Sequence, residues 1–198
     1  MLDFAEIGSV RESENANDDS FVERVARGDP EAIRDAYRRH HVAVRAFAGR
    51  LLGDNAAAED LVHDVFVALS RAARGFRGDC SFEGFLVGIA ANLARRHLRA
   101  SKRRRAAFAR LSLEPPVAPQ PPDQVAAEQE LVTQLMRALD ELPDKFRIAF
   151  VLVQIEERDA SEVAALLGVP ASTVRARVAT ARARLRSRRH FGTWQEHG

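Results

Sequence analysis

The chain has 198 residues, of which 46% are hydrophobic and 29% charged, and these proportions are typical of a soluble globular protein with one large or two small domains. A single cysteine excludes an internal disulfide framework, and no apolar run approaches the roughly 18 residues that a membrane-spanning helix needs. The N-terminus lacks the basic stretch and apolar core of a secretory signal. We therefore expect a cytoplasmic protein without membrane insertion.

The charges are unevenly distributed along the chain. The formal net charge is only +2, although the isoelectric point is near 9.2. Residues 1–20 carry six acidic residues against one arginine, whereas seven of the eleven residues from 95 to 105 are Arg or Lys and none is acidic. Local basic clusters of this kind are the electrostatic signature of a nucleic-acid-binding protein.

Four helices are predicted before residue 106, after a flexible acidic tail over residues 1–20. The first runs from Phe21 to Gly28. Asp29 caps the second and Pro30 suits its first turn. The predicted apolar stripe of the second helix consists of Ile33, Tyr37, His40, Val44, Phe47, Leu51 and Leu52. Asp54 or Asn55 caps the third helix, which ends near Gly75. After a loop over residues 75–81, Ser81 caps a fourth helix that runs to Arg105.

A proline-rich break separates these helices from four more. Five prolines lie between residues 115 and 122, so residues 106–126 are predicted to be an extended, semi-rigid linker. Helical periodicity resumes near Ala127, and a further helix spans residues 145–157. No alternating strand pattern occurs, and the predicted fold is all-α with two small helical domains.

The last two predicted helices have the pattern of a helix-turn-helix. Ala164 is small where two helices must approach closely, Gly168 stands at the tight turn, and Val174 lies on the buried face of the second helix. That second helix carries many arginines and no acid, and it is free to enter a DNA major groove.

Three segments together resemble the extracytoplasmic-function group (group 4) of sigma-70 family factors of bacterial RNA polymerase. Residues 58–69 resemble the family's second conserved stretch, residues 76–99 the adjoining stretch that reads the promoter −10 element, and residues 142–185 the domain that reads the −35 element. The resemblance implies region 2 over residues 21–105, region 4 over 127–190, and a tail over 191–198.

The resemblance also assigns roles to individual residues. The exposed side of the third helix would dock on the β′ subunit through Glu59, Asp60, His63, Asp64 and Val67. The −10 DNA would contact Phe76, Arg77, Asp79, Asn92, Arg95, Arg96 and Arg99. The −35 DNA would contact Ser172, Thr173, Arg175, Ala176, Arg177, Ala179 and Thr180. Asn92 has the paired donor and acceptor that read a base edge, and Arg175 can take a guanine edge in a bidentate contact.

Several residues depart from the family pattern. Ser70 and Phe85 stand where tryptophan is common, and Val87 and Gly88 replace an aromatic–basic pair, so stacking on the melted strand is weaker or placed differently. Phe82 and Phe85 are interpreted as core residues rather than stacking platforms. The lone Cys80 lacks a basic group that would activate it and is interpreted as inert.

The predicted function is a transcription initiation factor without catalysis, cofactor or metal, since the histidines show no ligand spacing. Its expected partners are the β′ and β subunits of core RNA polymerase, promoter DNA and an anti-sigma factor. Two alternatives stay open. One is a stand-alone helix-turn-helix regulator, and the other is a decoy that binds polymerase without melting DNA.

Overall fold

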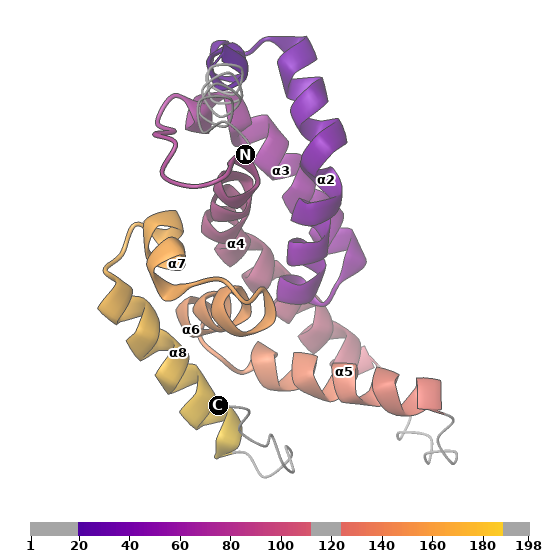
Figure 1. The fold of residues 1–198 in the computed structure, drawn as a ribbon. Helices are drawn as coiled ribbons and strands as arrows, with labels where there is room; N and C mark the ends of the chain where they lie inside the picture. Colours follow the sequence, from indigo (N-terminus) through magenta and orange to yellow (C-terminus); the bar gives the residue numbers. More distant parts are fainter. Residues whose placement is uncertain (1–19, 112–123, 188–198) are drawn as a thin grey trace, which may run out of the picture.

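The computed structural model describes residues 20–111 and 124–187, with side chains over 20–104 and 132–187. Throughout these ranges the chain is helical or in loops, as the periodicity predicted (Figure 1). A short helix over residues 20–27 precedes α2 (Pro30–Leu52), α3 (Asn55–Ala73) and α4 (Phe82–Leu111). The second half contains α5 (Gln124–Asp140), α6 (Asp144–Phe150), a π-helical turn η1 (Val151–Ile155), α7 (Ala160–Leu167) and α8 (Ala171–Arg186). None of the described helices is long and apolar enough to cross a bilayer.

The helix starts follow from cap residues that were readable in the sequence. Each cap side chain accepts a backbone N–H from the first turn, which otherwise has no partner within the helix. The four acceptors and their donors are Asp29 with Glu31 (2.9 Å), Asp54 with Ala57 (3.0 Å), Ser81 with Gly84 (3.1 Å) and Asp159 with Ser161 (2.6 Å). Gly168 ends α7 with a φ of 62°, a left-handed conformation that glycine adopts without strain.

Three helix boundaries differ from the sequence expectation. Helix α5 begins at Gln124, inside the linker predicted over 106–126. Helix α4 continues past Arg105 to Leu111, because residues 106–111 contain no helix breaker and the first proline comes only at Pro115. The helix expected over 145–157 is α-helical only to Phe150 and then widens into η1. Residues 112–123, with the prolines of the predicted linker, lie outside the described residues, as do both predicted tails. The domain boundaries therefore stay a prediction.

The core of the first half lies between α2, α3 and α4. Helix α3 buries apolar residues at helical spacing, namely Ala58, Leu61, Val62, Val65, Phe66 and Leu69. The predicted stripe of α2 is correct only toward its C-terminus. Near the N-terminus Ala32 and Ala36 are buried instead, and Tyr37 is 43% exposed. Helix α2 therefore packs there through its small residues, and its aromatic ring lies at the surface.

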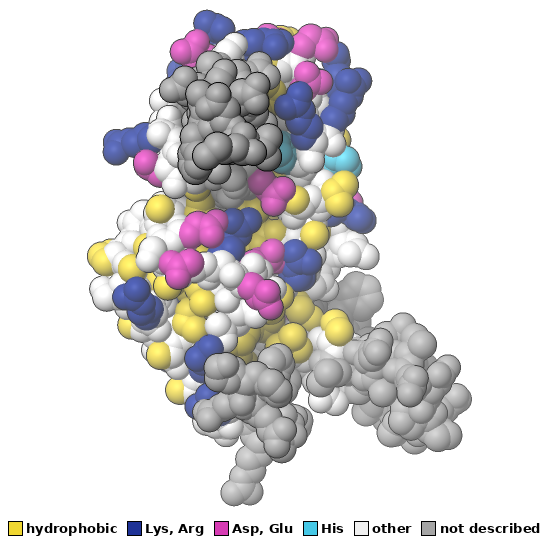
Figure 2. Space-filling view, in the orientation of Figure 1, with side chains coloured by type: hydrophobic (Ala, Val, Ile, Leu, Met, Phe, Trp, Pro, Cys, Tyr) yellow, Lys and Arg dark blue, Asp and Glu magenta, His cyan; other side chains and the backbone are white. Residues whose placement is uncertain are grey.

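The second half packs directly against the first. Helix α7 lies along α4, α6 reaches the C-terminal part of α4, and η1 touches α2 (Figure 1). The Arg147 side chain from α6 is completely buried and donates its Nε hydrogen to the Leu51 carbonyl at 2.8 Å. Acidic and basic side chains lie close together at mid-height on the face shown in Figure 2. Between the two halves, the Arg50 guanidinium of α2 donates two hydrogen bonds to the Glu156 carboxylate, at 2.6 and 2.9 Å.

Candidate nucleic-acid and polymerase interfaces

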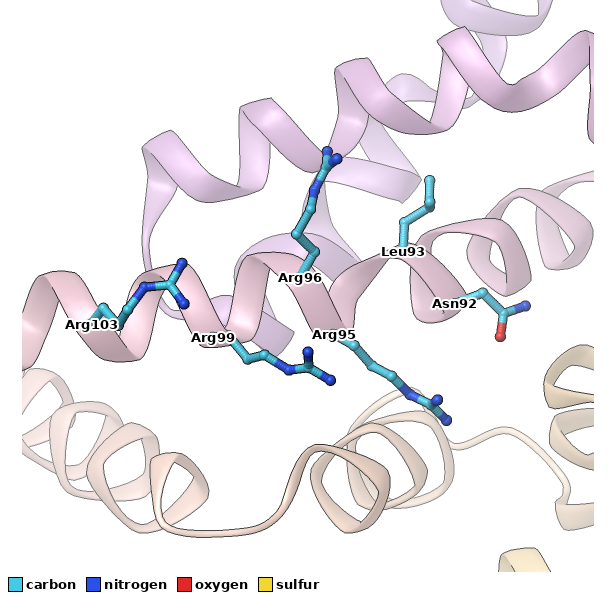
Figure 3. Close-up of a pocket in the computed structure, with 6 residues that line it drawn as sticks. All are labelled: Asn92, Leu93, Arg95, Arg96, Arg99 and Arg103. Atoms are coloured by element: carbon cyan, nitrogen blue, oxygen red, sulfur yellow. The ribbon is translucent and has the colours of Figure 1, made fainter.

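The basic side of α4 borders an open hollow. Its lining residues recur at spacings of three and four along the helix, and they are Asn92, Leu93, Arg95, Arg96, Arg99 and Arg103 (Figure 3). Asn92 and Arg95 extend toward the second half of the molecule, whereas Arg96 extends the opposite way, toward α3. Of the predicted −10 contacts, the structure therefore brings Asn92, Arg95 and Arg99 together, whereas the guanidinium of Arg96 is bonded to α3.

The arginines of this hollow differ in how far their charge is balanced. Arg99 lies 3.6 Å from Asp144, whereas no described carboxylate lies within ion-pair distance of Arg95 or Arg103. Both guanidinium groups are exposed. Unbalanced, exposed arginines along one helix face can neutralise the phosphates of a nucleic-acid strand.

The remaining predicted −10 contacts lie in the loop before α4 and differ in how exposed they are. Arg77 and Asp79 are exposed, whereas Phe76 is half-buried. The Phe76 ring centroid lies 4.8 Å from that of Phe85 and 6.0 Å from that of Phe82. Phe82 and Phe85 are themselves partly buried against the core, as the sequence interpretation held. The Phe76 ring is therefore engaged within this aromatic cluster and is not a free platform for a base.

Cys80 in the same loop is half-buried and has the chemistry of an inert thiol. Burial, and next the charges of Glu162 and Asp79, raise the pKa of the Cys80 thiol, and the opposing charge of Arg158 does not outweigh them. A thiol with a raised pKa carries little of the thiolate that reacts with oxidants. Among the described side chains, no group of three or more His, Cys, Asp or Glu could hold a metal ion.

The predicted polymerase-docking face of α3 is only partly exposed to solvent. Glu59, Asp60, His63 and Val67 are exposed, and Val67 has 68% of its surface accessible. Asp64 instead faces α4. It accepts a hydrogen bond from Arg96 and lies 2.7 Å from Nε2 of the buried His97.

The environment of Asp64 favours its ionised form. Burial is the largest influence and raises the pKa of this carboxyl group, but the hydrogen bond with His97 and the charge and hydrogen bond of Arg96 together bring the pKa below its usual value. Asp64 therefore joins α3 to α4. Its carboxylate could contact the polymerase only if it gave up its bonds with Arg96 and His97.

Tyr37 is a surface residue that the sequence reasoning placed in the core. Its ring stacks on His41 at 4.7 Å and meets the edge of Phe66 at 4.9 Å, so it lies beside the exposed face of α3. Val42, further along α2, is 65% exposed. The apolar stripe alone did not predict that Tyr37 is exposed, because the residues buried in this part of α2 are the alanines Ala32 and Ala36.

Helix α8 presents most of the predicted −35 contacts to solvent. Val174, Val178 and Ala181 are buried and fix which side of the helix faces outward. Ser172, Arg175, Ala176 and Ala179 are exposed, and Thr173, Arg177 and Thr180 are half-exposed. The Thr180 hydroxyl donates to the Ala176 carbonyl at 2.9 Å, so it is already engaged within the helix.

Two C-terminal arginines of α8 are exposed and also contact neighbouring elements. Arg182 bonds Gln154 at 3.0 Å, and the Arg184 guanidinium lies 5.1 Å from the Phe146 ring centroid. These residues fasten α8 to α6 and η1. The fully exposed residues among the predicted −35 contacts therefore lie between Ser172 and Ala179.

Comparison with known proteins places this chain in a family. The model of sigma-70 region 2 matches residues 36–104, and that of sigma-70 region 4 matches residues 133–185. The ECF RNA polymerase sigma-E factor of Escherichia coli K12 is 31% identical over 180 residues, which cover 86% of this chain and 93% of the relative. The ECF RNA polymerase sigma factor SigE of Mycolicibacterium smegmatis is 34% identical over 169 residues, covering 81% of this chain and 64% of the relative.

Solved structures agree with this placement. CnrH in complex with the cytosolic domain of CnrY superposes with a TM-score of 0.56 at 26% identity, covering 84% of this chain and 93% of that one. The sigma factor RpoE of Bartonella quintana, in complex with the anti-sigma factor NepR, shares the fold with a TM-score of 0.53 at 24% identity, covering 78% of this chain and 94% of that one.

The chain belongs to the sigma-70 family of RNA polymerase factors, in its extracytoplasmic-function group. It is accordingly a transcription initiation factor that directs RNA polymerase to promoters, and the stand-alone regulator is not favoured.

Proposed function

We propose that the two halves divide promoter recognition between α4 and α8. The exposed Arg95 and Arg99 hold phosphates of the −10 strand, and Asn92, on the same face, reads a base edge. The N-terminal part of α8, with Arg175 exposed, reads the −35 element in the major groove. The observation that carries this proposal is the basic hollow along α4, which a simple helix-turn-helix regulator does not need.

The polymerase would dock on the exposed side of α3. Asp60, His63 and Val67 lie at spacings of three and four and are exposed together, and Tyr37 on α2 extends the surface with an aromatic ring. Exposed large apolar and aromatic residues are typical of a protein interface. Asp64 contributes by holding α3 against α4.

The chemistry of transcription would belong to the polymerase, and we assign no catalytic residue, cofactor or metal to this chain. Two solved relatives are bound to anti-sigma factors, CnrY and NepR. By this similarity we propose that an anti-sigma factor also holds the present chain inactive. Its place of action would be the cytoplasm, where the polymerase is found.

A run-off transcription assay tests the proposal. The protein is mixed with bacterial core polymerase and DNA from upstream of its own gene, and a discrete transcript that depends on the protein is the expected result. An Arg175→Ala variant should weaken initiation at the −35 element but still bind core polymerase on a native gel. A matched His63→Ala, Val67→Ala variant should lose core binding. Loss of core binding in Arg175→Ala would contradict the assignment of roles.

A decoy would behave differently in the same assay. It would bind core polymerase on the gel, yet produce no transcript and no melted template. The aromatic cluster of Phe76, Phe82 and Phe85 is the observation that favours the decoy, because these rings contact one another. A factor that melts DNA needs a surface on which the displaced bases stack.

A further inference from the structure

Arg96 occupies the middle of the basic stripe on α4, although its guanidinium points elsewhere. Four residues that line the hollow follow one another at spacings of four, three and four, and they are Asn92, Arg96, Arg99 and Arg103. Such spacings place side chains on one face of a helix. The guanidinium of Arg96 nevertheless crosses to α3, where it donates a hydrogen bond to Asp64 (Figure 3). The backbone therefore presents Arg96 to the hollow, and one carboxylate on the neighbouring helix draws its charge away.

The bond between Arg96 and Asp64 can be given up at little cost. The Arg96 side chain is 74% exposed and that of Asp64 is 27% exposed, so water can replace the bond on both sides. His97, with 9% of its side chain exposed, lies 2.7 Å from the same carboxylate oxygen, Oδ2. When Arg96 leaves, the buried imidazole of His97 keeps its partner. Largely solvated ion pairs of this kind contribute little to stability.

A nucleic-acid strand in the hollow would compete with Asp64 for this arginine. Guanidinium groups bind carboxylates and phosphates by the same charge-assisted hydrogen bonds. Arg95 and Arg99, which the proposed function assigns to strand phosphates, come immediately before Arg96 and three residues after it. A phosphate held between them is within reach of Arg96 through rotation of its own side-chain bonds. Each arginine that reaches the strand also releases counterions, which an exchange with a lone carboxylate does not offer.

We propose that Asp64 holds Arg96 in place of a strand phosphate, and that the Arg96 guanidinium transfers from Asp64 to the −10 strand when DNA enters the hollow. The inference rests on the proposed function, which places that strand on α4. Asp64 is then an internal competitor of the DNA. It lowers the affinity of the hollow for a polyanion until a phosphate in the correct position displaces it.

The salt dependence of DNA binding tests whether Arg96 reaches the strand. The protein, with core polymerase in excess, is titrated with DNA from upstream of its own gene at several salt concentrations. Arg96→Ala should reduce the slope of log affinity against log salt by about one, as Arg95→Ala should. The matched control is Arg45→Ala, because Arg45 also pairs with an acidic residue of α3, Glu59, but is not among the residues that line the hollow. It should leave the slope unchanged.

The same titrations separate failure of the exchange from failure of the proposed function. A slope that falls in Arg95→Ala but stays at the native value in Arg96→Ala would overturn the exchange alone. Native slopes in both variants would show that the strand does not bind in the hollow, and the proposed use of α4 would fail.

Removal of the competitor supplies the second arm. Asp64→Asn keeps the shape of the side chain but not its charge, and it should raise the affinity for DNA by up to about fivefold, the limit that an exposed ion pair sets. In an Arg96→Ala background the same substitution should have no effect, because no guanidinium remains to be released. An equal gain in both backgrounds would overturn the proposal, since it would reflect only the general loss of a negative charge. An unchanged or lower affinity of Asp64→Asn would also overturn it, provided that a native gel shows the intact polymerase complex.

Discussion

Replacing the buried guanidinium of Arg147 should destabilise the protein strongly. Leu51 belongs to the last turn of α2, whose final carbonyls have no partner within the helix, and Arg147 satisfies one of them from another element. The same side chain pairs with Asp140, which is 20% exposed. Arg147→Met keeps most of the side-chain volume, so its effect isolates the polar contacts.

The expected loss follows from the two contacts that disappear. A hydrogen bond to a charged group contributes about 1.5–3 kcal/mol, and removal of one member of a buried ion pair costs about 3–5 kcal/mol. Because Asp140 can regain water, we expect Arg147→Met to lower the free energy of unfolding by about 2–4 kcal/mol. The matched control is Arg34→Met, whose pair with Glu31 is exposed on both sides and is worth about 1 kcal/mol at most.

Urea denaturation followed by circular dichroism measures both variants against the native chain. The slope of each transition shows whether the surface exposed on unfolding is unchanged. A loss below about 1 kcal/mol for Arg147→Met, or a loss equal to that of Arg34→Met, would show that the argument from buried polar contacts is wrong.

Three further outcomes are expected. Asp64 has a lowered pKa when folded, so its stabilisation is present above the usual carboxyl pKa and lost as the pH falls through the folded value. The difference in unfolding free energy between the native chain and Asp64→Asn, measured by urea denaturation, should therefore shrink in acid, and a difference that does not change with pH would contradict this role. Glu157 has a φ of 54°, so Glu157→Gly should raise the free energy of unfolding by up to about 1 kcal/mol, and a fall in thermal stability would contradict the strain. Arg95→Ala should weaken binding to promoter DNA in the polymerase complex and reduce the slope of log affinity against log salt by about one, whereas the exposed Arg74→Ala should leave that slope unchanged.

Local signals in the sequence were enough to predict the helices and their caps. Asp29, Asp54 and Ser81 indicate helix starts because a short polar side chain can satisfy the first backbone donors. The buried face of α3 was equally predictable, because its large apolar residues, from Leu61 to Leu69, recur at helical spacing.

The sequence failed where a position depends on partners distant in the chain. Tyr37 fits the apolar stripe of α2, yet Ala32 and Ala36 take the buried face, since only small residues fit there. Asp64 fits the exposed face of α3, but His97 and Arg96 draw it toward α4. No periodicity within one helix carries information about the charge on its neighbour, so the candidate docking face could be predicted only in part.

The packing of the halves was not predictable from the residues either. Gly88 was recognised as a departure from the family pattern, but its meaning depends on Leu166, far along the chain, whose Cδ2 would lie 3.3 Å from a Cβ atom added to Gly88. Likewise Arg147 reads as an ordinary surface arginine of an amphipathic helix, and only the three-dimensional fold shows that its guanidinium is buried.

The π-helical turn η1 fixes the angular register of everything that follows it. A π-turn holds one residue more than the corresponding α-turn, and one residue in a helix corresponds to about 100° of rotation. Deleting a single residue between Val151 and Ile155 would restore an ordinary helix, yet it would swing Glu156 away from α2 and rotate α7 and α8 about the axis of α6. The spacing between α6 and the helix-turn-helix is therefore constrained in length more strictly than in composition, and insertions or deletions there should be tolerated far less than substitutions.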